Sequence, residues 1–244
     1  DKLNRVISKN SSIGNITYIY DKELNGTLYK LSTNSLNNTF TYDNRQRKIG
    51  ELKAIDNIQF INNWTYDSMN RFTSAKYPNG EVINYTYNTQ GFLNSIYSNY
   101  NIIGGNPLHN ILTSTIYNEN SKIISRKYNN SLETVYGYNN TNSRLTQIQT
   151  NGKQDLSYLY DKVGNIIKIT DSINSGTETM SYDNLDRLIT SSKISNSGSI
   201  IFNYSYTYSP IGNIINATNN GVSKNYVYGT YPIHAPVSII EITN

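Results

Sequence analysis

One short motif recurs along the whole chain, and this repeat constrains the fold more than any other feature. The motif is an aromatic residue, any residue, and then Tyr followed by Asp or Asn, as in Trp64-Thr65-Tyr66-Asp67 and Tyr158-Leu159-Tyr160-Asp161. The second tyrosine of each copy is called the anchor below. The ten anchors are Tyr20, Tyr42, Tyr66, Tyr87, Tyr117, Tyr138, Tyr160, Tyr182, Tyr208 and Tyr228. Self-similarity at this spacing indicates stacked copies of one supersecondary unit.

The residues after each anchor also repeat. Counted from the Asp or Asn, the third position is a turn former such as Asn70 or Gly164, and the fourth is basic or Asn, such as Arg71. The fifth position is usually apolar, such as Phe72. The copies at Asp21 and Asn139 are expected to carry one extra residue before this pattern resumes. Asp1 fits the Asp of one further copy, 20 residues before Asp21.

The physical chemistry of this unit predicts a β-hairpin. Two aromatic residues spaced by two place both rings on one face of a strand, and aromatics favour strands. Asp or Asn then bonds to its own backbone in a turn, where Gly or Asn accepts a positive φ. No segment has a sustained helical period, so almost no helix is expected. The sequence therefore predicts an all-β fold of repetitive antiparallel β-hairpins forming a curled or spiral β-sheet.

We expect residues 1–244 to form a single array of about ten hairpins, each ~21 residues long, stable only against its neighbours. Enlarged loops are predicted near 98–111, which contains Gly104-Gly105-Asn106-Pro107, and near 193–200. The length predicts a substantial core. The charged fraction of 16% is low and favours sheets whose faces pack against each other.

Tyrosine is the outlier in the composition, with 23 Tyr against 5 Phe and 1 Trp. The main interpretation is structural: equivalent tyrosines stack along the sheet as an aromatic ladder. The alternative is a surface that stacks on sugars or bases, which calls for tyrosines outside the repeat register. Those residues are Tyr29, Tyr77, Tyr97, Tyr100, Tyr128 and Tyr231.

The unit Tyr-Asp-x-x-Gly/Asn-Arg-Leu, with variants such as Tyr160-Asp161-Lys162-Val163-Gly164-Asn165, resembles the YD repeat of RHS proteins. That family includes the bacterial Rhs toxins, the C components of insecticidal toxin complexes and the teneurins. The segment 228–237, with Tyr228-Gly229 and His234-Ala235, is similar to an element found between YD repeats.

The resemblance implies a long β-sheet that spirals into a hollow shell, which encloses an effector in the toxins and serves adhesion in teneurins. The sequence departs from the toxin pattern. It lacks the Asp-Pro-x-Gly core motif linked to effector release and shows no effector domain after the repeats. It is also shorter than a sealed shell requires. We therefore do not expect this chain to encapsulate a cargo by itself.

Catalysis, cofactors and metals are not expected. Zero Cys removes thiolate chemistry, and His109 and His234 are 125 residues apart with no triad or zinc spacing. His109 is expected to be solvated in its loop, and His234 to pack or hydrogen-bond. The repeat aspartates are interpreted as turn caps, because several copies carry Asn or Ser and Ca²⁺ needs 6–8 oxygen ligands. We predict that the protein is not an enzyme.

The charge pattern does not favour nucleic acid as a partner. The net charge is only +4, and no nucleic-acid motif is present. The recurring Arg beside a recurring Asp is interpreted as an ion pair within one turn or between neighbouring turns. No apolar run reaches the length of a membrane span.

Ten Asn-X-Ser/Thr sequons are close to the number expected by chance for this composition. They permit N-glycosylation if the chain is secreted. The family resemblance, without any visible targeting signal, implies an extracellular or cell-surface location. The sequon asparagines are Asn10, Asn15, Asn25, Asn37, Asn63, Asn84, Asn129, Asn139, Asn203 and Asn216.

The leading hypothesis is a non-enzymatic structural YD-repeat protein, a segment of a secreted or cell-surface β-shell that acts as scaffold or filament. Its partner would be a second copy, or the remainder of a longer RHS-like polypeptide, joined through open strand edges. One alternative is a fragment of an RHS toxin-encapsulating shell. Another is a carbohydrate-binding surface adhesin, with glycans as partners.

Overall fold

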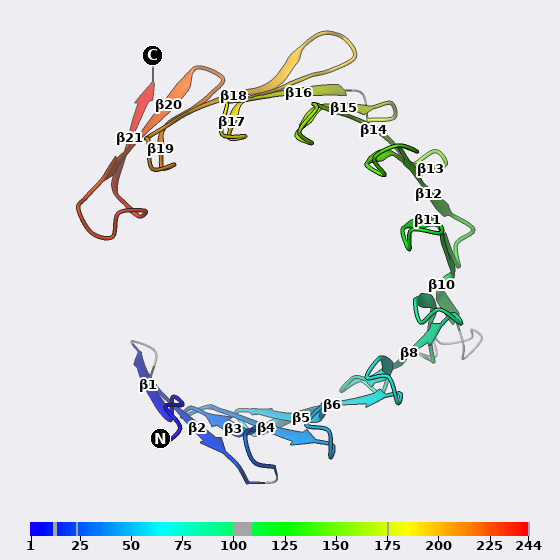
Figure 1. The fold of residues 1–244 in the computed structure, drawn as a ribbon. Helices are drawn as coiled ribbons and strands as arrows, with labels where there is room; N and C mark the ends of the chain where they lie inside the picture. Colours follow the sequence, from blue (N-terminus) through cyan, green and yellow to red (C-terminus); the bar gives the residue numbers. More distant parts are fainter. Residues whose placement is uncertain (12–13, 23, 100–108, 175, 244) are drawn as a thin grey trace. The chain divides into compact units, whose positions relative to one another are not determined.

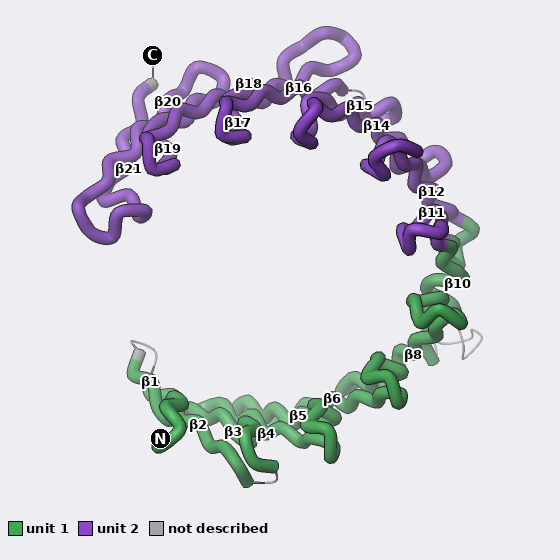
Figure 2. The backbone as a smooth tube through the Cα atoms, in the orientation of Figure 1, with its two compact units in different colours: residues 1–116, 127–131 green, residues 117–126, 132–244 purple. Residues whose placement is uncertain are grey.

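The computed structural model describes residues 1–244 except 12–13, 23, 100–108, 175 and 244. The described residues form 21 strands and no helix, in agreement with the predicted all-β fold (Figure 1). Contacts divide the chain into two compact units (Figure 2). Unit 1 comprises residues 1–116 and 127–131, and unit 2 comprises residues 117–126 and 132–244.

In unit 1, each strand pairs antiparallel with the next strand along the chain, from β1 to β10. Consecutive strands are thus spatial neighbours, as a series of hairpins requires. The strands are β1 (Ser8–Ser11), β2 (Gly14–Tyr20), β3 (Leu28–Ser32), β4 (Leu36–Tyr42), β5 (Lys48–Ile55), β6 (Ile58–Tyr66), β7 (Phe72–Lys76), β8 (Val82–Tyr87), β9 (Leu93–Ser98) and β10 (His109–Tyr117).

Unit 2 follows the same order, and its strands β12 to β21 pair consecutively and antiparallel. Strand β11 (Ile123–Tyr128) precedes them and has its first four residues in unit 2 and its last two in unit 1. The others are β12 (Glu133–Tyr138), β13 (Leu145–Thr150), β14 (Gln154–Tyr160), β15 (Ile166–Asp171), β16 (Gly176–Tyr182), β17 (Leu188–Ile194), β18 (Ile200–Tyr208), β19 (Ile214–Asn219), β20 (Val222–Tyr228) and β21 (Pro236–Thr243).

The anchor tyrosines mark the ends of strands. Each of the ten is the last residue of an even-numbered strand, from Tyr20 in β2 to Tyr228 in β20. The turn that follows, called the anchor turn, needs a residue in the left-handed region at its third position. Gly164 and Gly212 meet this need at φ 120° and 90°, and Asn70 meets it at φ 65°.

The turns at Asp21 and Asn139 are longer than the others. In the regular turn the Asp67 N–H donates to the Arg71 carbonyl, but the Asn139 N–H donates to Arg144, one residue further. The Asp21 N–H donates to Thr27, two residues further than in the regular turn. The prediction of one extra residue is therefore correct at Asn139 and wrong at Asp21.

A β-bulge follows most anchors. Ser181 pairs with Thr190 but Tyr182 pairs with Leu188, so Ile189 is an extra residue on β17. The same shift in register lies beside eight other anchors. Each bulge locally increases the twist of the hairpin that carries it.

Each unit is a single layer of sheet, and this overturns two expectations from the sequence. Of the described apolar side chains only Ala75 and Leu112 are buried, each 5% exposed. Within each unit, no second sheet covers either face of the described strands (Figure 2). The described residues of each unit therefore lack a substantial core, and no two sheet faces pack against each other within a unit. The expectation of packed faces rested on the low charged fraction, which does not determine whether a second sheet covers a face.

Of the two predicted enlarged loops, only the one near 193–200 lies within the described residues. Residues 100–108, with the Gly-Gly-Asn-Pro segment and Tyr100, lie outside the described residues. His109 was expected in that loop, but it is the first residue of β10 and is half-buried. Residues 195–199 join β17 and β18 by a turn in which the Ser195 N–H donates to the Ser199 carbonyl at 2.8 Å.

Candidate functional site

The repeat aspartates organise the anchor turns through their carboxylates. Asp67 accepts hydrogen bonds at Oδ1 from the backbone N–H groups of Met69 and Arg71, at 2.8 and 3.0 Å. Its Oδ2 accepts from Arg71 Nε at 2.7 Å. Equivalent contacts join Asp43 to Arg47 and Asp183 to Arg187. Each carboxylate thus caps its own turn and pairs with the arginine four residues later.

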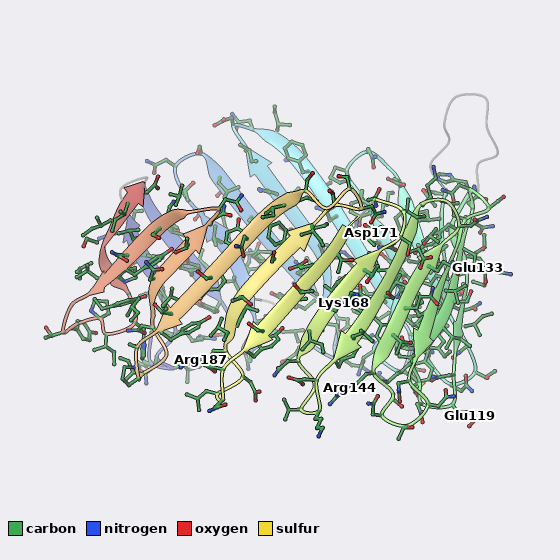
Figure 3. All side chains as sticks on the ribbon, turned by 90° about the horizontal axis from the view of Figure 1, so that it is seen from above. Glu119, Glu133, Arg144, Lys168, Asp171 and Arg187 are labelled. Atoms are coloured by element: carbon green, nitrogen blue, oxygen red, sulfur yellow. The ribbon has the colours of Figure 1, made fainter. Side chains whose placement is uncertain are left out.

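Arginines of the repeat also reach the next anchor turn. Arg47 Nη1 donates to the Asp67 carbonyl at 2.8 Å, and Arg144 Nη1 donates to the Asp161 carbonyl at 2.8 Å. Arg187 Nη1 donates to the Ser209 carbonyl at 3.2 Å. In unit 2, Arg144 and Arg187 lie at the same ends of the strands (Figure 3). The predicted ion pairs are thus found within turns, and between neighbouring turns for Arg5 with Asp21, whereas the other contacts to the next turn are hydrogen bonds to backbone carbonyls.

Among the described residues, a cation of the preceding repeat lies over the ring of six anchor tyrosines. The Arg71 guanidinium lies 4.3 Å from the Tyr87 ring centroid, and the Arg187 guanidinium lies 4.7 Å from that of Tyr208. The ring pair Tyr66–Phe72, at 4.6 Å, lies within one repeat. At these six anchors the contact between repeats joins a ring face to a positive charge, which is favourable, and is not the predicted stacking of tyrosine on tyrosine.

Most anchor hydroxyls bind the backbone of the preceding hairpin. Tyr208 Oη donates to the Leu188 carbonyl at 2.7 Å, where strand β17 begins. The carbonyl acceptors belong to the first residues of return strands, or to Val6, the equivalent residue before β1. The remaining bonds run from Tyr20 to Val6, Tyr42 to Leu28, Tyr66 to Lys48, Tyr87 to Phe72, Tyr138 to Ile123, Tyr182 to Ile166 and Tyr228 to Ile214.

These contacts shift the pKa values of the groups that make them. The Arg5 guanidinium and the Gly26 N–H hold the pKa of the Asp21 carboxyl at about 2. Hydrogen bonds from Arg187 and from the Arg71 backbone likewise lower the pKa of Asp183 and Asp67, respectively. All three carboxylates are therefore charged and engaged at neutral pH, which is the state of a structural cap.

Where the fourth position is Asn, the amide replaces the guanidinium. Asn165 Nδ2 donates to its own Asp161 at 3.0 Å and to Asp186 of the next turn at 2.8 Å. Asn213 Nδ2 donates to the Ile233 carbonyl at 2.6 Å, and His234 Nδ1 lies 2.8 Å from Asn213 Oδ1. His234 is therefore a hydrogen-bonding residue of this row of turns.

The second position of the anchor turns carries exposed apolar side chains, a feature that the sequence reasoning missed. Four consecutive turns of unit 2 present Val163, Leu185, Ile211 and Tyr231, which are 70, 68, 60 and 90% exposed. Adjacent anchor turns are two strands apart, so these side chains recur about every 10 Å. Counting the second position along the repeat would have found this row, called the apolar stripe below.

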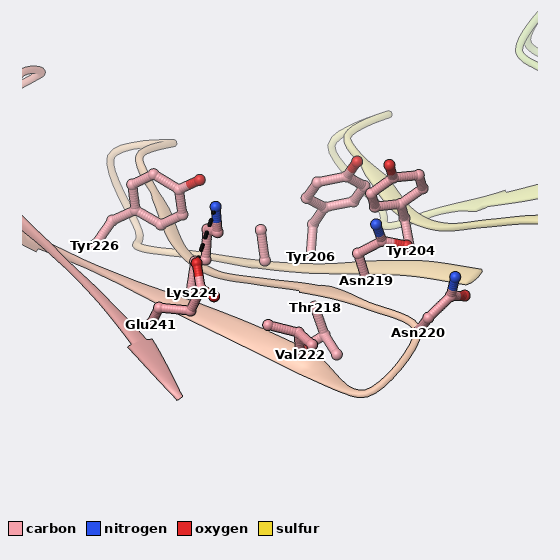
Figure 4. A pocket seen from close by; sticks show the side chains of 10 residues that line it. Tyr204, Tyr206, Thr218, Asn219, Asn220, Val222, Lys224, Tyr226 and Glu241 are labelled. Atoms are coloured by element: carbon pink, nitrogen blue, oxygen red, sulfur yellow. Dashed lines mark ion pairs between the residues drawn. The ribbon is translucent and has the colours of Figure 1, made fainter. Parts of the chain in front are cut away.

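A groove lies on the sheet face that carries the anchor tyrosines, called the tyrosine face. It has a volume of about 570 Å³ and runs over β18 to β21 of unit 2 (Figure 4). Its aromatic lining comes from Tyr204, Tyr206 and Tyr226. Tyr206 and Tyr226 are the first aromatics of their repeats, whereas Tyr204 lies two residues before its repeat; none of the six out-of-register tyrosines named from the sequence is in this lining. Of that set, Tyr29 lies under Lys22 Nζ at 4.4 Å and Tyr231 belongs to the stripe.

The sequon asparagines occupy three settings. Asn25 lies in an anchor turn, Asn139 takes the Asp position of another, and Asn129 lies in the turn between β11 and β12. Strand alternation places the other seven opposite the tyrosine face. These are Asn10, Asn15, Asn37, Asn63, Asn84, Asn203 and Asn216.

The described residues contain no group of three or more His, Asp or Glu side chains that could hold a metal ion. His109 and His234 lie in different units. In the same described part of the chain, no helix could span a membrane.

Comparison with known proteins matches the fold and not the sequence. No family model and no curated protein sequence matches the chain. The crystal structure of TcdB2-TccC3-Cdc42 matches over 91% of the chain with a TM-score of 0.74 and 16% identity. The Photorhabdus luminescens Tc holotoxin pore, with the mutation TccC3-D651A, matches over 93% with a TM-score of 0.72 and 16% identity.

The chain covers only 14% and 13% of those two structures. The similarity therefore identifies the hairpin-repeat architecture of the chain and spans about one seventh of the longer proteins. An open antiparallel sheet of hairpins is the arrangement that they share with it.

Proposed function

We propose that the chain is a non-enzymatic structural protein, a scaffold segment of a secreted or cell-surface YD-repeat β-shell. One observation carries the proposal. The recurring polar side chains of the repeat are engaged in holding neighbouring hairpins together, as Arg187 does between Asp183 and Ser209. Side chains that form fixed hydrogen bonds in repeat after repeat support a structural role, because a reaction would need groups free to meet a substrate.

The scaffold would extend through its strand edges. Among the described strands, β21 pairs with β20 and with no other, so its second edge offers free N–H and C=O groups. Its side chains Val237, Ile239 and Ile240 are exposed. A free apolar strand edge is a template for another strand. The occupant would be a second copy or a further part of the same polypeptide.

The test introduces a charge at this edge. Lysine on an edge strand disfavours pairing, so Ile240→Lys should convert assemblies seen by negative-stain microscopy into single particles. The matched control is Leu159→Lys in β14, an equally exposed residue on a strand that pairs on both sides. It should leave assembly unchanged. Strictly single particles of the unmodified protein would contradict assembly through strand edges.

A toxin-encapsulating shell is the second candidate, and the similarity to the TcdB2-TccC3 structures favours it. The two candidates differ in what the complete polypeptide contains. An Asp-Pro-x-Gly motif followed by a variable tail in the full-length gene would support the toxin shell. A gene that continues only with YD repeats would support the scaffold.

A further inference from the structure

The groove on the tyrosine face includes a small side chain. Ala217 on β19 pairs with Tyr206 on β18 and with Lys224 on β20. At the equivalent position several repeats carry isoleucine, as in the pairs Tyr158–Ile169 and Tyr226–Ile239, whereas Ala75 takes this place opposite Trp64. Relative to an isoleucine, Ala217 leaves a hollow in the groove beside Tyr206.

Two tyrosine rings line one side of this hollow. The Tyr204 and Tyr206 ring centroids lie 6.2 Å apart with an interplanar angle of 11°, so the two neighbouring rings are almost parallel (Figure 4). The Phe202 ring lies next to them, 5.3 Å from Tyr204 and tilted by 49°. Aromatic rings of this kind offer an apolar face together with a polar edge. The C–H face of a pyranose ring is complementary to such a surface.

Polar groups of both kinds surround the rings. Lys224 Nζ lies 3.2 Å from Glu241 Oε2, and the two side chains are 50% and 54% exposed. Asn219 is the residue opposite Tyr204 on the neighbouring strand. Its side-chain amide adds a hydrogen-bond donor and a hydrogen-bond acceptor to the groove. Hydroxyl groups both donate and accept hydrogen bonds, so a polyhydroxylated ligand fits this set.

The net charge of the groove distinguishes between the classes of ligand that stack on aromatic rings. Lys224 and Glu241 neutralise each other, and the described lining of the groove carries no other charge. Single-stranded nucleic acids also stack on tyrosines, but they require an excess of positive charge along the phosphates. A neutral groove with paired charges therefore suits an uncharged ligand.

We propose that this groove binds a neutral oligosaccharide. Two adjacent sugar rings stack on Tyr204 and Tyr206, and their hydroxyls bond to Lys224, Glu241 and Asn219. The site goes beyond the scaffold role and does not depend on it. It would give a surface assembly an affinity for a polysaccharide.

The test titrates the protein with cellohexaose, laminarihexaose, maltohexaose and chitohexaose by isothermal calorimetry. At least one should bind, and Ala217→Leu, which fills the hollow without removing a binding group, should raise its Kd at least tenfold. Glu241→Gln, at a half-exposed position, should weaken binding while circular dichroism stays unchanged. The matched control is Tyr231→Ala, an exposed tyrosine outside the groove, which should bind as the unmodified protein does.

Three results would overturn the proposal. The first is the absence of binding by all four hexasaccharides. The second is an unchanged Kd in a folded Ala217→Leu protein. The third is tighter binding of oligo(dT) than of any sugar, with the same sensitivity to Ala217→Leu. Loss of filament formation without loss of sugar binding would contradict the scaffold proposal and not the proposed sugar site.

Discussion

The anchor tyrosine joins two hairpins with one side chain. The Tyr208 hydroxyl donates to the Leu188 carbonyl of the preceding hairpin, and its ring lies beneath Arg187. Burial raises the pKa of Tyr208, so the hydroxyl keeps its proton through the physiological range. Tyrosine is thus required at this place, because phenylalanine would supply the ring without the donor.

Replacing Tyr208 by Phe should lower the free energy of unfolding by about 1 kcal/mol, the typical net value of one hydrogen bond. The stacking of Arg187 on the ring persists in this variant. Urea denaturation followed by circular dichroism measures the change. Tyr231→Phe, at a tyrosine that is 90% exposed, is the control and should cost almost nothing. Equal losses in the two variants would show that the Tyr208 hydroxyl contributes no stability.

The lowered carboxyl pKa values predict that stability falls in acid. A group whose pKa is lower in the folded protein contributes stability above its unfolded pKa and loses it as pH falls through the folded pKa. For Asp21 the window runs from its ordinary value near 4 down to about 2. The urea midpoint should therefore be constant between pH 6 and 5 and decline between pH 4 and 2.

Asp183→Asn provides the control for this acid effect, since Asn88 and Asn118 already occupy the same position in other repeats. The variant should be less stable at pH 6 and should show a shallower decline below pH 4. A decline as steep as that of the unmodified protein would assign the acid effect to other groups.

At the scale of the element, the anchor turn has a fixed backbone conformation and variable side chains. Its third position takes a positive φ whether the residue is Gly212 at 90°, Asn70 at 65° or Ser121 at 61°. An added Cβ at Gly212 would meet no atom within 4 Å. The cost of substitution there is therefore conformational and not steric.

Gly212→Ala should lower the free energy of unfolding by about 1 kcal/mol or more, because Ala disfavours the left-handed region. Gly212→Asn should lower it less, since Asn enters that region more readily and does so at Asn70. Thermal unfolding of the two variants shows which substitution lowers the stability more. A loss that is greater for Asn than for Ala would show that side-chain volume, and not the backbone, limits this position.

The sequence predicts the hairpin well because each of its signals is local. The alternation in Tyr206-Thr207-Tyr208 and the turn residues that follow favour their structures through residues that are close in the sequence. The features that escaped prediction depend on contacts across strands. The hollow at Ala217 appears only once β18, β19 and β20 are in register, and the cation over Tyr208 comes from the preceding repeat.

The single layer also lay beyond prediction. The low charged fraction of 16% favoured packed sheet faces, yet strand residues such as Leu159 and Ile201 are exposed. Nothing in the alternation itself says whether another sheet will cover an apolar face. The single layer depends on contacts between whole hairpins, and the sequence of one repeat does not determine these contacts.

At the scale of the whole molecule, stability is a sum over neighbouring hairpins. Among the described strands, each contacts only its neighbours along the chain, and buried apolar residues are nearly absent from the same residues. In such arrays a local defect has a local effect. The two compact units should then respond independently to a change in one of them.

Hydrogen exchange with mass spectrometry tests this independence. Gly212→Ala should speed exchange in peptides from β18 to β20, where the altered turn lies. Peptides from β2 to β8 in unit 1 should exchange as in the unmodified protein. Uniform acceleration across all peptides would mean that the chain unfolds as one cooperative body, contrary to the quasi-one-dimensional picture.

The one-layer construction has a thermal consequence. Heat capacity rises on unfolding in proportion to the apolar surface newly exposed to water, usually by 12–15 cal/mol/K per residue. In this chain residues such as Ile201, Leu159 and Ile240 are already about half exposed to water in the folded state. The heat-capacity increment per residue should fall below the usual range. The curve of stability against temperature is then broad and flat, and the protein changes little in stability between cold and warm surroundings.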